Sequence, residues 1–227
     1  MLKALITTSA AKLDKSQTKD WLNAVLYLEP GVDYKTICRA SSNGCRASCL
    51  THSGMMRMPA QTAARIERTK LYLTEREKFM QRLHSEIAGL LRKAERQGKR
   101  LALRLNGTSD LDWTEVYAQY PEIQFYEYTK RPDLILKSKN LTNLHMTFSR
   151  TENTKASTIK RMVEAGANVA VVFDDKKEMP LVFMGMKVID GDDHDRRFED
   201  KNGNIVGLKL KGTLATKQAA RDCGFAI

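Results

Sequence analysis

Residues 168–174 read Asn168-Val-Ala-Val-Val-Phe-Asp174, five apolar residues in a row between two polar ones. A run without alternation of polar and apolar residues is typical of a strand buried on both faces, as in a parallel sheet covered by helices. The segment before it, Ala156–Ala165, has a helical pattern that Gly166 ends. A helix followed by such a strand is part of a βαβ unit, so this stretch indicates an α/β fold.

The same alternation of helix and strand extends over most of the chain. Besides Val169–Asp174, strands are expected over Ala24–Glu29, Leu101–Asn106, Gln124–Tyr128, His145–Ser149, Met186–Asp190 and Ile205–Leu210. Helices are expected over Pro59–Gln97, where Pro59 suits a first turn and Gly98 a stop, and over Thr114–Tyr120. We predict a single domain over residues 1–227, with a mostly parallel sheet, open or curled into a partial (β/α) barrel, and one long basic helix.

The composition is that of a globular protein. The chain of 227 residues is 42% hydrophobic and 29% charged, which is enough apolar material for a sizeable core and excludes wholesale disorder. No apolar run approaches the roughly 18 residues of a membrane-spanning helix. Residues 1–6 lack the apolar core of a secretion signal. We therefore expect a soluble cytoplasmic protein without a membrane partner.

The charge balance favours an anionic partner. The formal net charge is +11 and the pI is near 9.5, which indicates nucleic acid ahead of a membrane surface. Residues 57–104 hold 13 Lys and Arg against 5 Glu, which is +8 of that +11. Along this segment Arg57, Arg65, Arg68 and Arg76 are predicted to contact nucleic acid. The alternative is an ordinary solvated helix face.

Three of the four cysteines lie in the segment Cys38-Arg-Ala-Ser-Ser-Asn-Gly-Cys45-Arg-Ala-Ser-Cys49. Clustered thiols in a cytosolic chain suggest a metal or redox role, because disulfides are rare there. The small polar residues between them can bend around a site, and Arg39 and Arg46 are expected to favour the thiolate form that binds metal. The alternative is a set of unrelated buried thiols.

Two metals fit this segment. Zinc takes four ligands, and His52 would complete a Cys3His set with Cys38, Cys45 and Cys49. A four-iron, four-sulfur cluster is normally held by four thiolates. Three local thiolates would leave one iron open to a substrate or cofactor, unless Cys223 supplies the fourth. Both metals remain open at this point.

Polar residues follow several of the expected strands. Because ligands of parallel sheets bind beyond the carboxyl ends of the strands, we predict that Asn106, Asp110, Tyr128 and Lys130 bind substrate. The alternative for each of them is a cap or turn role.

The segment Asp190-Gly-Asp-Asp-His-Asp-Arg-Arg197 is the densest group of titratable residues. Carboxylates beside a histidine can bind a divalent ion or act as general acid and base. We predict a catalytic cluster of Asp190, Asp192, His194, Asp195 and Arg197. The alternative is a solvated turn before the next strand.

The loop Cys38…Cys45…Cys49 after a first strand, followed by βα units, resembles in outline the radical S-adenosylmethionine enzymes, which have a partial TIM-barrel fold. The resemblance implies that the three cysteines hold a four-iron cluster whose open iron takes the amino and carboxylate groups of S-adenosylmethionine. Six residues separate Cys38 from Cys45, a wider spacing than is usual in that family.

A second resemblance covers most of the chain. The stretches Ser42-Asn-Gly-Cys-Arg-Ala-Ser-Cys49, Arg104-Leu-Asn-Gly-Thr-Ser-Asp110, Phe125-Tyr-Glu-Tyr-Thr-Lys130 and Val188-Ile-Asp-Gly-Asp-Asp-His-Asp-Arg-Arg-Phe198 are similar to motifs of an uncharacterised family of bacteriophage-encoded proteins. This resemblance implies a phage or mobile-element origin, and hence the cytoplasm of an infected or plasmid-bearing bacterial host. It adds no mechanism.

Three functions follow as hypotheses. The first is a metal enzyme that acts on nucleic acid or a nucleotide-derived substrate, for example by modifying a base. A variant is base exchange by an enzyme similar to the transglycosylases, whose Cys3His zinc site the residues Cys38, Cys45, Cys49 and His52 could mimic. The last is a replication or regulatory protein that binds nucleic acid and contains a structural metal.

Overall fold

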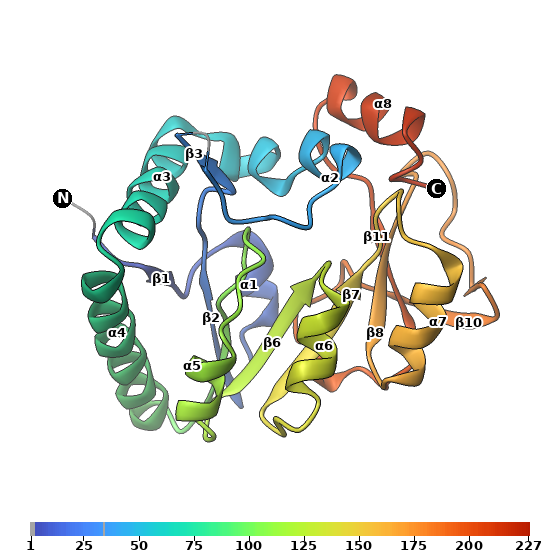
Figure 1. The fold of residues 1–227 in the computed structure, drawn as a ribbon. Helices are drawn as coiled ribbons and strands as arrows, with labels where there is room; N and C mark the ends of the chain where they lie inside the picture. Colours follow the sequence, from blue (N-terminus) through green and yellow to red (C-terminus); the bar gives the residue numbers. More distant parts are fainter. Residues whose placement is uncertain (1–2, 34) are drawn as a thin grey trace.

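The computed structural model describes residues 3–33 and 35–227 (Figure 1). Within this part the main sheet has nine strands in the order β1-β2-β5-β6-β7-β8-β11-β10-β9. Their bounds, in that order, are Ile6–Thr7, Trp21–Leu26, Arg100–Arg104, Gln124–Thr129, Leu144–Ser149, Asn168–Phe173, Ile205–Lys209, Met186–Asp190 and Val182–Phe183. The seven strands from β2 to β10 are parallel, and β1 and β9 are antiparallel edge strands. The predicted α/β fold with a mostly parallel, open sheet is confirmed.

Helices connect the strands. Their bounds are α1 Ala11–Ser16, α2 Asn43–Ala47, α3 Pro59–Thr74, α4 Arg76–Arg96, α5 Thr114–Gln119, α6 Pro132–Ser138, α7 Ala156–Glu164 and α8 Leu214–Asp222. Short 3-10 turns lie at Leu50–His52, Gly54–Arg57 and Arg197–Glu199, and a separate small ladder pairs β3 (Gly31–Val32) with β4 (Lys35–Thr36). None of the helices in the described part of the chain is long and apolar enough to span a membrane.

The two faces of the sheet differ in what covers them. Helices α4, α5, α6 and α7 pack on one face, here called the outer face (Figure 1). Its core includes Phe79 and Leu83 of α4 against Leu103 and Phe125 of the sheet. The opposite face, here called the inner face, is covered by α1 and by the 3-10 turn at Arg197–Glu199. Side chains alternate between these faces along each strand.

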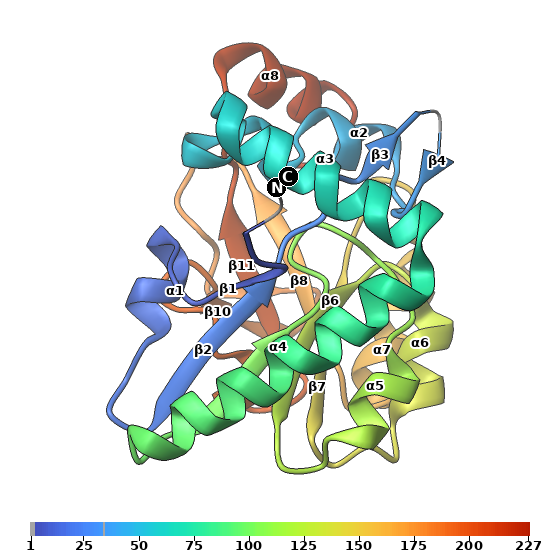
Figure 2. The same cartoon turned by 90° about the vertical axis from the view of Figure 1, so that its left-hand side faces the viewer.

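The long basic helix predicted over Pro59–Gln97 is two helices. The break is at Glu75, whose backbone (φ −134°, ψ 56°) is not helical. Helix α3 is tied to the end of β2, because the Thr69 hydroxyl accepts a hydrogen bond from the Glu29 amide (2.8 Å). Helix α4 instead packs its apolar stripe along the outer face, so the chain must turn between the two (Figure 2).

Candidate metal centre at the carboxyl edge of the sheet

The cysteine segment spans the edge where the parallel strands end, here called the carboxyl edge (Figure 1). Ser42 caps α2, as its hydroxyl accepts a hydrogen bond from the Cys45 amide (3.2 Å). Glu152, which follows β7, accepts hydrogen bonds from the Ser42 hydroxyl (2.5 Å) and the Gly44 amide (2.8 Å). The Cys38 thiol donates to the carbonyl of Thr108, beyond β5 (3.6 Å). The segment is therefore held over the ends of β5 and β7.

Lys130 directly follows β6, and its ammonium group interacts electrostatically with the thiols of Cys38, Cys45 and Cys49. Its side chain is half-buried and hydrogen-bonds to Cys45. Burial alone would lower the pKa of Lys130, but the charges of Cys45, Asp110, Cys38 and Cys49 outweigh burial and raise it. The predicted substrate residue Lys130 thus belongs to the thiol site.

Burial controls the ionisation of the thiols. It raises the pKa of Cys38 to about 12 and raises that of Cys45 as well, against the opposing charge of Lys130. The expectation that Arg39 and Arg46 favour thiolates is wrong, because Arg39 is exposed and Arg46 donates to Ser41 and Asn43 instead. Both thiols are therefore protonated at neutral pH, and a metal would displace their protons on binding.

The two candidates for the fourth metal ligand, His52 and Cys223, lie in different parts of the structure. His52 is exposed in the 3-10 turn Leu50–His52. Cys223, which ends α8, packs against α2, since a methyl group at Gly44 would come within 2.6 Å of its Sγ. In the ranges 3–33 and 35–227 no three His, Cys, Asp or Glu side chains are already arranged as a metal-ligand set.

Two of the predicted substrate residues organise a turn. The Asn106 Oδ1 atom accepts hydrogen bonds from Ser109 (2.8 Å), the Leu111 amide (2.9 Å) and the Trp113 indole (3.2 Å). Asp110 accepts from the Thr129 hydroxyl (2.7 Å) and the Lys130 amide (3.0 Å). Both side chains are buried, so they hold the segment after β5 against β6 and do not present hydrogen-bonding groups to a ligand.

Tyr128, the fourth predicted substrate residue, lies on the inner face. The Arg104 guanidinium stands over its ring, with 4.6 Å between Cζ and the ring centroid. Its hydroxyl belongs to a group of buried polar atoms without a hydrogen-bond partner in the described part of the chain. The inner-face members on β6, β7 and β8 are Tyr126 Oη, Tyr128 Oη, His145 Nε2, Thr147 Oγ1 and Asn168 Nδ2. Each such group costs about 1–3 kcal/mol of stability if it stays unpaired.

The predicted acidic cluster is divided over two places. At the end of β10, the Asp190 carboxylate accepts a hydrogen bond from the Asp192 amide (2.7 Å). Asp192 accepts from the Lys209 amide (2.8 Å) and pairs with Lys211 (2.5 Å). These contacts are those of a turn and a partly exposed ion pair, in agreement with the structural alternative.

Asp195 and Arg197 are buried against the inner face of the sheet. Asp195 forms an ion pair with Arg104 of β5 (3.0 Å). Arg197 donates to the carbonyl of His194 (2.7 Å) and pairs with Asp200 (3.1 Å). Burial, followed by the charges of Arg197 and Arg196, lowers the pKa of His194. The members of the predicted catalytic cluster thus bind different partners, and Asp195 and Arg197 hold the segment before β11 against the sheet. Their catalytic role stays a prediction.

The motifs that fold into this edge belong to a known family. A family model described as Gene product 88 matches residues 3–227. The chain belongs to this family. No curated protein and no solved structure matches it. Membership agrees with the predicted likeness to phage-type gene products.

The arginines predicted to contact nucleic acid in this Gene product 88 chain are largely used inside the protein. Arg65 is only 2% exposed and pairs with Glu29 (2.8 Å). Arg68 donates to the carbonyl of Ala4 (2.9 Å). Arg76 stands over the Tyr72 ring, with 4.0 Å between Cζ and the centroid. Arg57 and Arg76 are exposed, whereas the buried Arg65 has a structural ion pair, so contact with nucleic acid stays a prediction for these arginines.

We expect Arg65→Ala to destabilise the fold and Arg57→Ala to leave it unchanged. Removing Arg65 leaves Glu29 partly buried without its ion pair, which should lower the free energy of unfolding by about 2 kcal/mol. Urea unfolding followed by circular dichroism measures this difference. Equal stability of the two variants would contradict the structural role of Arg65.

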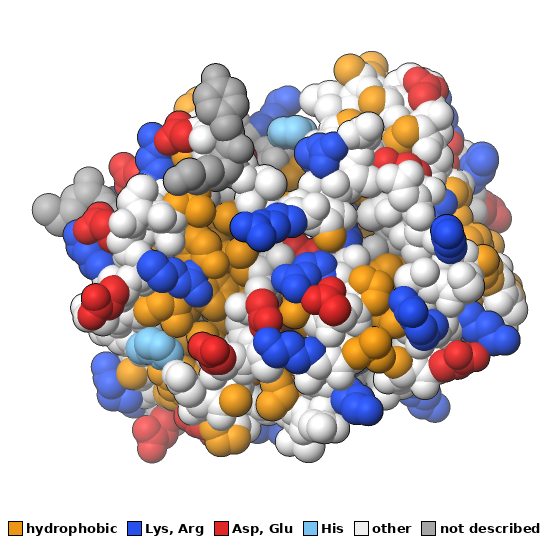
Figure 3. All heavy atoms as spheres, viewed as in Figure 1, with side chains coloured by type: hydrophobic (Ala, Val, Ile, Leu, Met, Phe, Trp, Pro, Cys, Tyr) orange, Lys and Arg blue, Asp and Glu red, His pale blue; other side chains and the backbone are white. Residues whose placement is uncertain are grey.

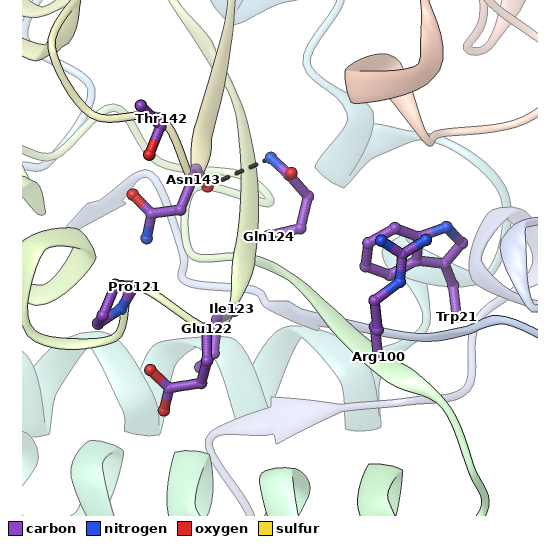
Figure 4. A pocket seen from close by; sticks show the side chains of 8 residues that line it. All are labelled: Trp21, Arg100, Pro121, Glu122, Ile123, Gln124, Thr142 and Asn143. Carbon is purple, nitrogen blue, oxygen red and sulfur yellow. Dashed lines mark hydrogen bonds between the residues drawn. The ribbon is translucent and has the colours of Figure 1, made fainter.

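The surface has dispersed charged side chains and a hollow away from the thiol site. On the face in Figure 3, Lys and Arg are dispersed, with Asp and Glu between them. One hollow lies at the opposite end of the sheet, at the amino ends of β5 and β6, and its lining includes Trp21, Arg100 and Gln124 (Figure 4). Because ligands of parallel sheets bind at the carboxyl ends, the thiol site is the stronger candidate.

Proposed function

We propose that this protein is a phage-type iron–sulfur enzyme that acts on nucleic acid or a nucleotide-derived substrate. Cys38, Cys45 and Cys49 would hold a four-iron, four-sulfur cluster at the carboxyl edge. The observation that supports the proposal is the grouping of three thiols near the half-buried Lys130, at the edge where parallel sheets bind their ligands.

Iron is preferred to zinc because of the fourth ligand. Zinc in a structural site needs four protein ligands, and its fourth candidate, His52, is exposed. A cluster held by three thiolates keeps one iron open for a substrate or cofactor, which suits an enzyme. S-adenosylmethionine is the cofactor that the resemblance of the cysteine loop implies, and its amino and carboxylate groups would occupy that position.

The protein's own groups have defined tasks in this proposal. Three thiolates add negative charge to a buried place, which is unfavourable without a neighbouring cation. Lys130 supplies that cation from the end of β6. Glu152 keeps α2 over the end of β7 through Ser42 and Gly44, so it orients the loop that carries the thiols.

The substrate class is inferred from the charge of the chain. A net charge of +11 favours an anionic polymer or nucleotide. Modification of a base fits a phage-type gene product. The acidic residues after β10 are engaged elsewhere, so proton transfer would fall to other groups at this site.

A second candidate is a nucleic-acid-binding protein with a structural metal. The ion pairs of Asp195 with Arg104 and of Asp192 with Lys211 favour it, because an enzyme that used those carboxylates would gather them at the metal. Base exchange of the transglycosylase type gains no support, since it depends on a zinc site completed by His52.

Metal analysis of protein purified without oxygen tests the proposal. We expect about four iron and four sulfide per chain and a broad absorption band at roughly 400 nm. One zinc per chain and no colour would overturn the iron–sulfur proposal in favour of a structural site. DNA and RNA incubated with the reduced protein and S-adenosylmethionine, then digested to nucleosides, should show a new mass; unchanged nucleosides would favour the second candidate.

A further inference from the structure

The cysteine segment lies in the longest stretch of the sequence that contains no carboxylate. No Asp or Glu occurs between Asp33 and Glu67, whereas Lys and Arg occur at five positions there. The acidic residues that balance basic ones elsewhere in the chain are thus absent from the stretch that contains the three neighbouring thiols. A basic stretch of this kind attracts a polyanion.

Three of the five cations are exposed arginines. They are Arg39, Arg46 and Arg57, and none of them has an ion pair with a carboxylate of residues 3–33 or 35–227. The hydrogen bonds of Arg46 go to Ser41 and Asn43, which are uncharged. Glu152 reaches the same segment, but its carboxylate is hydrogen-bonded to the start of α2. The three guanidinium groups are therefore available to an anionic ligand.

Exposed apolar side chains lie in the same stretch. Leu50 is 46% exposed, Met55 71% and Met58 48%. They lie in or next to the 3-10 turns that run from α2 to α3 along the carboxyl edge (Figure 1). The Cys49 amide donates to the carbonyl of Arg46 (3.3 Å), so the first turn begins where α2 ends. A group of exposed apolar side chains indicates a contact surface, and a thioether sulfur packs favourably against an aromatic ring.

The three arginines and the three apolar residues, together called the docking surface, border the thiol site. Each neighbouring cysteine is followed directly by a member of this surface, in the order Cys38-Arg39, Cys45-Arg46 and Cys49-Leu50. The Cα atoms of adjacent residues are about 3.8 Å apart. The cysteines are half-buried, whereas the residues that follow them are exposed. A ligand on the docking surface would therefore lie at the rim of the proposed cluster.

We propose that the docking surface binds a single strand of nucleic acid across the thiol site. The arginines would contact phosphates, and Leu50, Met55 and Met58 would contact the faces of the bases. A duplex would leave these apolar side chains without a partner, because its base faces are stacked on one another. Enzymes that modify a base act on a single strand or on a base taken out of the stack. This inference rests on the proposed function and specifies its substrate.

The test is fluorescence anisotropy of labelled oligonucleotides of about 20 nucleotides, titrated with anaerobically purified protein at several salt concentrations. We expect a single strand of DNA or RNA to bind at least about tenfold more tightly than the duplex of the same sequence. Replacing Arg39, Arg46 and Arg57 together with Ala should reduce the slope of log Kd against log salt by about 2, because each phosphate contact of a single strand contributes about 0.7. Met55→Ser combined with Met58→Ser should weaken single-strand binding about tenfold and leave the salt slope unchanged.

The matched control replaces Arg92, Arg96 and Arg161 with Ala. These arginines are exposed near the C-terminal ends of α4 and α7, which precede β5 and β8, so the control removes the same charge at the opposite end of the sheet. Its affinity for the single strand and its salt slope should be those of the wild type.

Four results would overturn the inference. They are the absence of single-strand binding, equally tight binding of the duplex or of polyglutamate, an unchanged affinity in the methionine variant, and an equal loss in the control. Equal binding of polyglutamate would indicate an acidic protein as the partner instead. Iron is measured on the same wild-type protein, so single-strand binding without iron would reject the proposed iron–sulfur function alone, and iron without single-strand binding would reject the inference alone.

Discussion

Replacing Cys45 with Ser should reduce the iron content of anaerobically purified protein at least about tenfold, because a serine hydroxyl is a poor ligand for iron–sulfur clusters. The same loss is expected for Cys38→Ser and Cys49→Ser. The fold should survive, since Ser42 and Glu152 hold α2 through contacts that do not involve the thiol. Iron and sulfide assays, with circular dichroism on each variant, make the measurement.

The chain contains two matched controls for this prediction. Cys223→Ser changes a thiol that packs against α2 at Gly44, and His52→Ala changes an exposed imidazole. Both variants should keep the wild-type iron content. Loss of iron in Cys223→Ser would make Cys223 the fourth ligand, and an unchanged content in Cys45→Ser would reject the three-thiolate site.

Asp195→Ala should lower the free energy of unfolding by about 3–5 kcal/mol, because it leaves the buried Arg104 guanidinium without its ion pair. For a chain of this length the melting temperature should fall by about 10 °C. Calorimetry or a thermal melt followed by circular dichroism measures the change. If Asp195 were instead part of a catalytic cluster, the Asp195→Ala variant would be stable but inactive.

Asp192→Ala is the control, since Asp192 has a partly exposed ion pair with Lys211. Exposed pairs contribute about 0–1 kcal/mol, so its melting temperature should fall by only a few degrees. If Asp195→Ala melts as the wild type does, the structural role of Asp195 is refuted.

The parallel sheet could be predicted because helical and strand-like segments alternate along the chain and because β8, which is buried on both faces, has a continuous apolar sequence. The predicted strand Met186–Asp190 has the observed bounds of β10, whereas the predicted strand Ala24–Glu29 begins three residues after the observed start of β2 at Trp21. Strands β1 and β9 have two residues each, too few for a pattern. The break at Glu75 could not be predicted, since the helical pattern continues across it and tertiary packing sets the turn.

The candidate site, too, could be predicted only in part from the sequence. The cysteines could be found because they are close in sequence as well as in space. Glu152 was missed because its contact with Ser42 spans 110 residues and no local pattern marks it. The different surroundings of the acidic residues could not be predicted, because neighbours in sequence have different partners: Asp195 pairs with Arg104, 91 residues away, whereas Asp192 pairs with Lys211.

The most direct measurement of the central claim is a crystal structure of the anaerobically purified protein, with anomalous diffraction recorded at the iron absorption edge. We predict a strong iron peak at the carboxyl edge, bounded by the Sγ atoms of Cys38, Cys45 and Cys49, with Lys130 beside it and one iron without a protein ligand. The absence of iron at this position, or a single zinc ion bound by the three thiolates and His52, would contradict the account.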